Sequence, residues 1–323
     1  MDHDESQTVV SHSTTGRWKL GLTLSLVASL LWGTLPIALK VLVANVNPKT
    51  IVFYRLFTVS LFLSVLLYRK GEWAKLKQPG ISVFALFAIA TAGLTGNNLV
   101  FLLGLEYISP SASQVVIQLA PMFLLTGAVL LLKEPFSRSQ WLGLAVLLLG
   151  LTLFFSQRLG ELETYRNEYT VGVMLVIVSA ILWAAFGLSQ KLLLSSYSPT
   201  LILWVISTAG GFGMLIAAKP LQINQLDGIQ LLLLLYCGLN TLLSYSSFGE
   251  ALVHWETSKV SAVIATTPLI TVGLMEVGAS LFPSYIEPEN LNLPSIAGAA
   301  LVVLGSILTA VGQRRPPKCY LNK

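Results

Sequence analysis

The sequence predicts an all-α polytopic membrane protein in which ten transmembrane helices form two inverted five-helix repeats. Three observations lead to this fold class. Of the 323 residues, 54% are hydrophobic and only 11% are charged, whereas roughly a quarter of the residues in a soluble domain are charged. The apolar residues occur in long runs, and a helix needs about 20 such residues to cross a bilayer. Finally, the pattern of the first half of the chain recurs in the second half.

Five apolar runs precede a polar linker and five follow it. The predicted transmembrane helices span residues 20–43, 51–68, 81–105, 111–132, 141–155, 170–194, 201–218, 229–248, 258–281 and 296–311. Pro48, Pro199 and Pro294 stand just before three of these helices, where the missing N–H of proline costs little.

The repeats and the polar stretches define the expected domain limits. A disordered cytoplasmic tail is expected at 1–16, a first repeat at 17–157 and a linker at 158–168. The second repeat is expected at 169–312, followed by a basic cytoplasmic tail at 313–323.

The lysines and arginines predict the orientation of the chain. If the N-terminus is cytoplasmic, fourteen of the 20 basic residues fall on the cytoplasmic side and five on the outer side, while Arg55 lies inside a helix. Basic loops remain on the cytoplasmic side of a membrane, so both termini are expected there and the protein is expected in the cytoplasmic membrane. Anionic membrane lipid accounts for the net charge of +5, and no nucleic-acid partner is expected.

The internal repeat is visible in the order of its marker residues. The segment "LLWGTLPIALK" at 30–40 returns as "ILWAAFGLSQK" at 181–191. The marker residues Gly21, Trp32, Lys40 and Pro48 recur with one constant shift at Gly172, Trp183, Lys191 and Pro199. Because five is an odd number of spans, the second copy enters the membrane upside down. Inverted repeats of this kind place a substrate site near the bilayer midplane between the two copies.

Three segments carry a resemblance to a known family. They are the "LLWGTLPIALK" opening, Arg55 within "IVFYRLFTVSLFL", and "LGLEYISPSASQVVIQLAPMFLLTGAVLLLKEP" with Pro121 and Glu134. Over about residues 21–312 the sequence resembles the drug/metabolite transporter superfamily, in particular its ten-helix EamA-type members. The resemblance implies a carrier that moves small metabolites, often amino acids or related solutes, by alternating access. The second half departs from the pattern, because Ile206 stands where Arg55 would recur and no glutamate recurs in place of Glu134.

The sequence offers no constellation for catalysis. The aspartates are Asp2, Asp4 and Asp227, and two of the three histidines lie in the N-terminal tail. There is no HExxH, Gly-x-Ser-x-Gly or phosphate-cradling motif. We therefore expect no catalytic residue, no metal and no cofactor, and the chain is not expected to be an enzyme.

Polar and aromatic residues at membrane depth are the candidates for a solute cavity, since polar groups there usually face protein or water. The candidate substrate-binding residues are Trp32, Asn97, Asn98, Gln114, Gln118, Trp183, Ser244, Tyr245 and Thr266. The alternative is that the polar residues bond neighbouring helices and that the tryptophans pack in the core.

Charged residues and helix breakers are the second group of candidates. Arg55 is expected to reach the surface or to pair with a substrate carboxylate or with Glu106, and Glu250 and Glu276 are candidates for coupling. Lys40 and Lys191 are expected to reach lipid headgroups. The residues expected to bend helices are Pro36, Pro121, Gly187 and Pro268.

The sequence thus predicts a secondary transporter for a small polar or amphipathic metabolite, with an amino acid or related zwitterion as the favoured solute. The alternatives are a lipid, lipid-linked sugar or nucleotide-sugar translocase of the same fold, and an intramembrane enzyme. A homodimer is left open.

Overall fold

The computed structural model describes residues 15–71, 80–132, 137–156, 168–283, 285–289 and 291–311, and every regular element in these ranges is a helix. The first half contains α1 (Trp18–Val43), α2 (Pro48–Lys70), α3 (Ile81–Tyr107), α4 (Pro110–Val116), α5 (Leu119–Leu132) and α6 (Arg138–Phe154). The second half contains α8 (Glu168–Leu193), α9 (Pro199–Leu215), the 3-10 turn η3 (Pro220–Gln225), α10 (Gly228–His254), α11 (Thr257–Ile264), α12 (Thr267–Leu281) and α13 (Leu293–Val311). Nearly all of both predicted tails, most of the predicted linker and Glu134 lie outside the described residues.

The predicted all-helical membrane fold is confirmed. Each predicted span coincides with one helix or with two consecutive helices separated by a break. Within the described ranges, seven helical stretches are long and apolar enough to cross a membrane, and Arg138–Phe154 and Pro199–Leu215 are shorter apolar helices.

Sequence signals explain where several helices begin and end. Asn47 and Ser198 cap α2 and α9, and a proline follows each cap as the first helical residue. Gly71 ends α2 with a φ of 64°, a left-handed conformation that glycine adopts without steric cost. The ends of these spans are therefore set by local side-chain chemistry.

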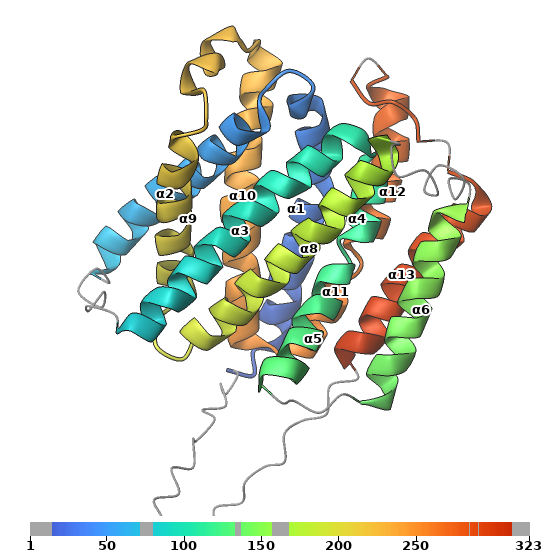
Figure 1. Ribbon diagram of the computed structural model, residues 1–323, viewed down its shortest axis with the longest axis horizontal. Coiled ribbons are helices and arrows are strands. Elements are labelled where there is room, and N and C mark those ends of the chain that lie inside the picture. Colours follow the sequence, from blue (N-terminus) through green and yellow to red (C-terminus); the bar gives the residue numbers. More distant parts are fainter. Residues whose placement is uncertain are drawn as a thin grey trace, which may run out of the picture.

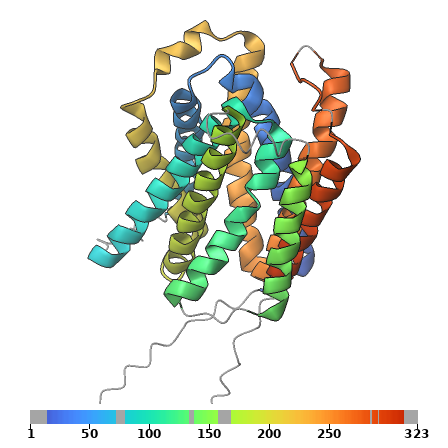
Figure 2. The same cartoon turned by 45° about the vertical axis from the view of Figure 1, so that its right-hand side comes forward.

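The two halves pack against each other rather than side by side as separate domains. Helix α3 packs along α8 and α1 packs along α10, so exchanging the halves converts one pairing into the other. The second helices of the halves, α2 and α9, pack together, as do the last helices, α6 and α13 (Figures 1 and 2). This pairing is what two inverted five-helix repeats related by an approximate two-fold axis require.

Glycines bring α6 and α13, the last helices of the two halves, into close contact. A Cβ atom on Gly150 would meet the backbone nitrogen of Val302, and one on Gly298 would overlap the backbone nitrogen of Phe154. Small residues allow two membrane helices to approach until their backbones touch. The recurring segments "GLAVLLLG" and "GAALVVLG" thus lie against each other.

The fourth span of each half is broken, although the sequence analysis expected one continuous helix in each place. Helix α4 ends at Val116 before Pro121, and α11 ends at Ile264 before Pro268. Proline lacks an N–H and its ring crowds the carbonyl of the residue four positions earlier. The breaks fall at or beside those positions, 117 and 264.

Pro36 has a different outcome, because α1 continues through it. Proline frees the carbonyl of the residue four positions earlier, here Trp32, and this oxygen accepts a hydrogen bond of 2.9 Å from Gln114 Nε2. The flanking carbonyls are also bonded, Leu31 by Asn240 Nδ2 at 2.7 Å and Gly33 by Thr271 Oγ1 at 2.8 Å. Helix α1 is thereby joined to α4, α10 and α12 at one level of the bundle.

Candidate solute-binding site

A cavity of about 130 Å³, which we call the central cavity, lies where the two broken spans meet α1, α3, α8 and α10. Its polar and aromatic lining comes from both halves of the chain. The lining residues are Trp32, Leu35, Pro36, Leu39, Asn97, Asn98, Phe101, Gln114, Ile117, Gln118, Ala120, Pro121, Trp183, Tyr245, Ile264 and Thr267. This set contains no lysine, arginine, aspartate or glutamate, so the cavity is lined without formal charge.

Seven of the nine candidate substrate-binding residues lie at this cavity. The other two do not: Ser244 is fully buried and donates to the carbonyl of Thr241, and Thr266 donates to the carbonyl of Val263. Neighbouring residues on a helix point about 100° apart. The adjacent Tyr245 and Thr267 therefore face the cavity while Ser244 and Thr266 turn away.

The two asparagines of α3 differ in how they are held. Asn97 Nδ2 donates to the carbonyl and the hydroxyl of Ser179 on α8, at 3.0 and 2.7 Å. Asn98 Nδ2 donates to the carbonyl of Leu94, one turn earlier in the same helix, at 2.8 Å. Asn97 thus joins α3 to α8, whereas the hydrogen bond of Asn98 is local.

The two glutamines lie one turn apart along the fourth span. Gln114 Nε2 donates to the Trp32 carbonyl at 2.9 Å, and Gln118 Nε2 donates to the Ala265 carbonyl at 2.9 Å. Gln118 and Ala265 occupy the two helix breaks, so this hydrogen bond connects the broken spans across the cavity. The predicted helix-bonding role and the predicted lining role are therefore filled by the same side chains.

Aromatic rings form another part of the cavity wall. The ring of Trp32 packs edge-on against Tyr245 with centroids 5.3 Å apart, and lies 5.4 Å from Phe248. Trp183 packs edge-on against Phe186, which packs edge-on against Tyr245, with ring centroids 6.4 and 6.1 Å apart. Both tryptophans therefore serve the packing of the bundle and the surface of the cavity.

The apolar part of the lining has no conspicuous signal in the sequence. Leu35, Leu39, Phe101 and Ile264 look like any other apolar residue in a transmembrane run. The available signal is helical spacing, since Phe101 follows Asn97 by four residues and shares its face.

Arg55 is 3% exposed, and its Nε donates to Thr241 Oγ1 on α10 at 3.0 Å. The predicted pairing with Glu106 is not formed, because Arg55 faces α10 while Glu106 is exposed at the end of α3. Among the described residues no carboxylate lies within ion-pair distance of Arg55. Arg55 is also absent from the lining of the cavity.

The remaining charged candidates lie away from the cavity. Glu250 pairs with His254 Nε2 at 3.2 Å at the end of α10, where Thr15 also approaches the histidine. Glu276 is on the exposed face of α12, and Lys191 is exposed near the end of α8. Gly187, a predicted bending position, lies within an unbroken α8 and packs against Leu124.

Lys40, expected to reach lipid headgroups, is partly exposed and has its ammonium group against the end of α3. Its Nζ donates to the carbonyls of Leu105, Glu106 and Ile108 at 2.6, 3.2 and 3.1 Å. The last turn of α3 contains no basic residue, and the last carbonyls of a helix lack partners within the helix and favour a cation. Lys40 of α1 therefore caps α3.

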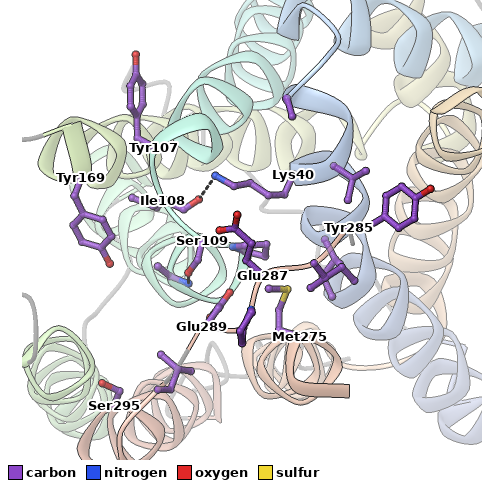
Figure 3. Close-up of a pocket in the computed structure, with 18 of the residues that line it drawn as sticks. Lys40, Tyr107, Ile108, Ser109, Tyr169, Met275, Tyr285, Glu287, Glu289 and Ser295 are labelled. Carbon is purple, nitrogen blue, oxygen red and sulfur yellow. Dashed lines mark hydrogen bonds between the residues drawn. The ribbon is translucent and has the colours of Figure 1, made fainter. Parts of the chain in front are cut away.

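A second, larger cavity of about 660 Å³ opens at the end of the bundle opposite the first residue of α1 and the last residue of α13. Figure 3 shows Lys40 and Glu287 facing each other across it, with Ser109 between α3 and α4 nearby. Glu289 accepts a 3.1 Å hydrogen bond from the backbone nitrogen of Ser111 near the start of α4. We call this cavity, lined by Lys40, Ser109, Glu287, Glu289 and their neighbours, the vestibule.

The described part of the chain contains no group of three or more His, Cys, Asp or Glu side chains that could hold a metal ion.

Comparison with known proteins places this architecture among membrane transporters. The sequence profile of the EamA-like transporter family matches residues 19–156 and 170–311, once for each half. The chain is 38% identical over 301 residues to YhbE of Escherichia coli K12, an uncharacterized inner membrane transporter, with 91% of this chain and 92% of YhbE covered. It is 36% identical to an uncharacterized transporter of Haemophilus influenzae, with 92% and 97% covered.

One solved crystal structure has the same fold, with a TM-score of 0.64 at 16% identity, and the match covers 94% of this chain and 99% of that chain. At this identity the likeness concerns the fold alone.

Proposed function

The chain belongs to the EamA-like transporter family, and on that premise we propose that it is a secondary carrier for an amino acid or related zwitterion. It is an integral protein of the cytoplasmic membrane, in keeping with its inner-membrane relative. Because the family consists of transporters, the chain is not the intramembrane enzyme that the sequence left as an alternative. The solute moves through the central cavity by alternating access between the two halves.

The observation that carries the solute assignment is the uncharged, amide-rich and aromatic lining of the central cavity. Such a lining suits a small solute whose own charges cancel, because a net charge in a low-dielectric site requires an opposite charge or several hydrogen bonds. Amides offer both donors and acceptors to a zwitterion. The aromatic wall contributes apolar contact to a side chain.

The two other solute classes fit this lining less well. A nucleotide sugar carries a pyrophosphate, and no lysine or arginine lines the cavity. A lipid or lipid-linked sugar needs a lateral opening, and the apolar groove of about 510 Å³ between α3 and α9 shares no lining residue with the cavity. An amino acid therefore remains the favoured solute.

The vestibule is the proposed entrance on the outer side. It lies at the end of the bundle remote from the start of α1 and the end of α13, which the charge distribution predicts to be cytoplasmic. Helix α4 contributes to both spaces, since Ala112 lines the vestibule and Gln114 lines the cavity. We propose that the solute passes from one to the other when the broken spans shift.

The deciding experiment is uptake of pooled radiolabelled amino acids into sealed proteoliposomes, with and without a pH gradient. We expect saturable uptake by the full chain and its loss in Trp32→Ala, which removes the ring but keeps the backbone carbonyl bonded by Gln114. A gradient-dependent rate would identify proton coupling.

The matched control is Thr126→Val, because Thr126 makes a hydrogen bond to Met122 within α5 and does not line the cavity. We expect this variant to transport normally. Folded protein that moves none of the amino acids would rule out this solute class, and normal uptake by Trp32→Ala would show that the solute passes elsewhere.

A further inference from the structure

The amides of the central cavity have a common orientation, and we propose that this orientation makes the cavity a receptor for the ammonium group of its solute. The inference rests on the proposed solute site and specifies which end of the solute the amides bind. It assigns the oxygens of Asn97, Asn98, Gln114 and Gln118 as the acceptors. Solutes with a protonated amine are recognised, and a carboxylate alone is not.

The orientation of each amide is set by its partner. Asn98, Gln114 and Gln118 each face a backbone carbonyl, at 2.8, 2.9 and 2.9 Å. A carbonyl can only accept a hydrogen bond, so the atom facing it must be the amide nitrogen. Asn97 likewise faces the carbonyl of Ser179 at 3.0 Å. All four nitrogens therefore lie against the protein.

The four amide oxygens are left for a ligand. No hydrogen bond reaches them from any described residue, and none is among the fully enclosed polar atoms that lack a partner. The four side chains are only 6–7% exposed and line one cavity, so the accessible surface of their oxygens is cavity surface. Acceptors buried this deeply are costly when they remain unbonded.

Acceptors outnumber donors in this space. Each side-chain amide has two N–H donors and an oxygen with two lone pairs. Asn97 uses both N–H groups on Ser179, while the other three amides each use one. An ammonium group has three donors and no acceptor, so it complements the free oxygens better than a carboxylate, which can only accept.

The aromatic wall favours the same charge. Trp32, Trp183 and Tyr245 line the cavity beside the amides, and the faces of such rings attract a cation. The lining contains no cationic side chain, and Arg55 is held against Thr241 outside it. The amides and the rings together thus favour a positive group, and the lining provides no counter-charge for a negative one.

The test uses three probes that differ only at the polar end: phenethylammonium, its N-trimethylated form and 3-phenylpropionate. Binding to the purified full chain in detergent is followed by tryptophan fluorescence, because two tryptophans line the cavity. Phenethylammonium should bind at least about tenfold more tightly than 3-phenylpropionate, because its charged N–H groups donate hydrogen bonds to the amide oxygens and a carboxylate has no donor. Trimethylation keeps the charge and removes the donors, so it should weaken binding.

Two substitutions at one position separate the oxygen from the fold. Asn98 is chosen because its own hydrogen bond lies within α3. Asn98→Leu should weaken phenethylammonium binding about tenfold without affecting 3-phenylpropionate, whereas Asn98→Asp loses the donor to Leu94 but keeps the acceptors and adds a negative charge, so it should bind the amine at least as tightly. Thr126→Val is again the control outside the cavity, and a structural defect would weaken all three probes together.

The outcomes distinguish this inference from the transport proposal. If amino acids are transported but 3-phenylpropionate binds as tightly as phenethylammonium, the ammonium assignment is wrong and the carrier stands. Equal binding of the trimethylated probe, or unchanged amine binding in Asn98→Leu, would overturn the role of the oxygens. If no probe binds and no amino acid is transported, both proposals fail.

Discussion

At the scale of single residues, polar side chains in the core donate hydrogen bonds to backbone carbonyls that lose their helical partners at prolines and helix breaks. Gln114 bonds the Trp32 carbonyl that Pro36 frees, and Gln118 bonds the Ala265 carbonyl in the break before Pro268. In an apolar interior an unbonded carbonyl costs about 1–3 kcal/mol. The prolines and the amides are therefore parts of one arrangement, although they lie on different helices.

The hydrogen bond from Thr271 to Gly33 gives a prediction about stability. Thr271 is fully buried and its Oγ1 donates to the Gly33 carbonyl at 2.8 Å. Thr271→Val keeps the shape and removes the donor, so we expect a loss of about 1 kcal/mol of unfolding free energy, seen as a lower melting temperature in detergent. Thr152→Val, an exposed residue bonded within α6, is the control and should melt like the unmodified protein.

The position of Arg55 gives a prediction about affinity. Its guanidinium is bonded to Thr241 and does not line the cavity. We therefore expect Arg55→Met to alter stability or maximal rate while the KM for the transported amino acid stays within about twofold, a change of only ~0.4 kcal/mol in binding. A rise of KM by ten times or more in folded protein would instead identify Arg55 as a partner of the substrate carboxylate.

At the scale of helices, two devices set the architecture: proline-dependent breaks in the fourth spans and glycine contacts between the last spans. The breaks in the fourth spans keep backbone groups near the cavity, and the glycine contacts allow α6 and α13 to touch along their backbones. Gly143 and Gly305 repeat the contact about two helical turns away from Gly150 and Gly298. The α6–α13 pair is therefore expected to act as a rigid unit.

Gly298 tests this contact directly. A Cβ there would overlap the backbone nitrogen of Phe154, and neither backbone can yield without separating the helices. Gly298→Ala should lower the melting temperature and the yield of monodisperse protein. In contrast, Gly273→Ala meets no atom within 4 Å and should be neutral or stabilising by up to about 1 kcal/mol, because alanine favours the helix. Equal behaviour of the two variants would show that the contact contributes nothing.

At the scale of the whole molecule, the vestibule lies at the opposite end of the bundle from the start of α1 and the end of α13. The charge distribution predicts cytoplasmic termini, so the vestibule should face outward. Glu287→Cys should react with a membrane-impermeant maleimide added to intact cells, in a chain that also carries Cys319→Ser. Cys237 is fully buried and should stay silent. Labelling of Glu287→Cys only after permeabilisation would reverse the orientation.

The fold could be predicted from the sequence because the bilayer imposes simple requirements. Spans are visible as apolar runs, and the repeat is visible because Trp32, Lys40 and their counterparts keep one spacing. The breaks in the fourth spans were not predicted, although Pro121 and Pro268 were recognised as bending positions. In α1 the carbonyl that Pro36 frees is bonded by Gln114, and a partner so distant in the sequence cannot be read from the local pattern around a proline.

The site was only partly accessible to the same reasoning. Large polar and aromatic side chains such as Asn98 and Trp183 are conspicuous in an apolar run, and the cavity is lined by them. The phase of a helix is harder to read, so Ser244 was named although only its neighbour Tyr245 reaches the cavity. The capping role of Lys40 was not visible either, because the end of α3 that it bonds lies in another part of the chain.

The pairing of helices across the two halves has a consequence for how the protein is made. Helices α1, α2, α3 and α6 leave the ribosome first, yet each finds its most extensive partner among α8, α9, α10 and α13. The nascent first half therefore waits in the bilayer without its packing surfaces covered, exposed to membrane proteases and dependent on the insertion machinery. Synthesis must reach the last span, α13, before α6 has its partner, so a chain cut short near its end should be degraded rather than partly active.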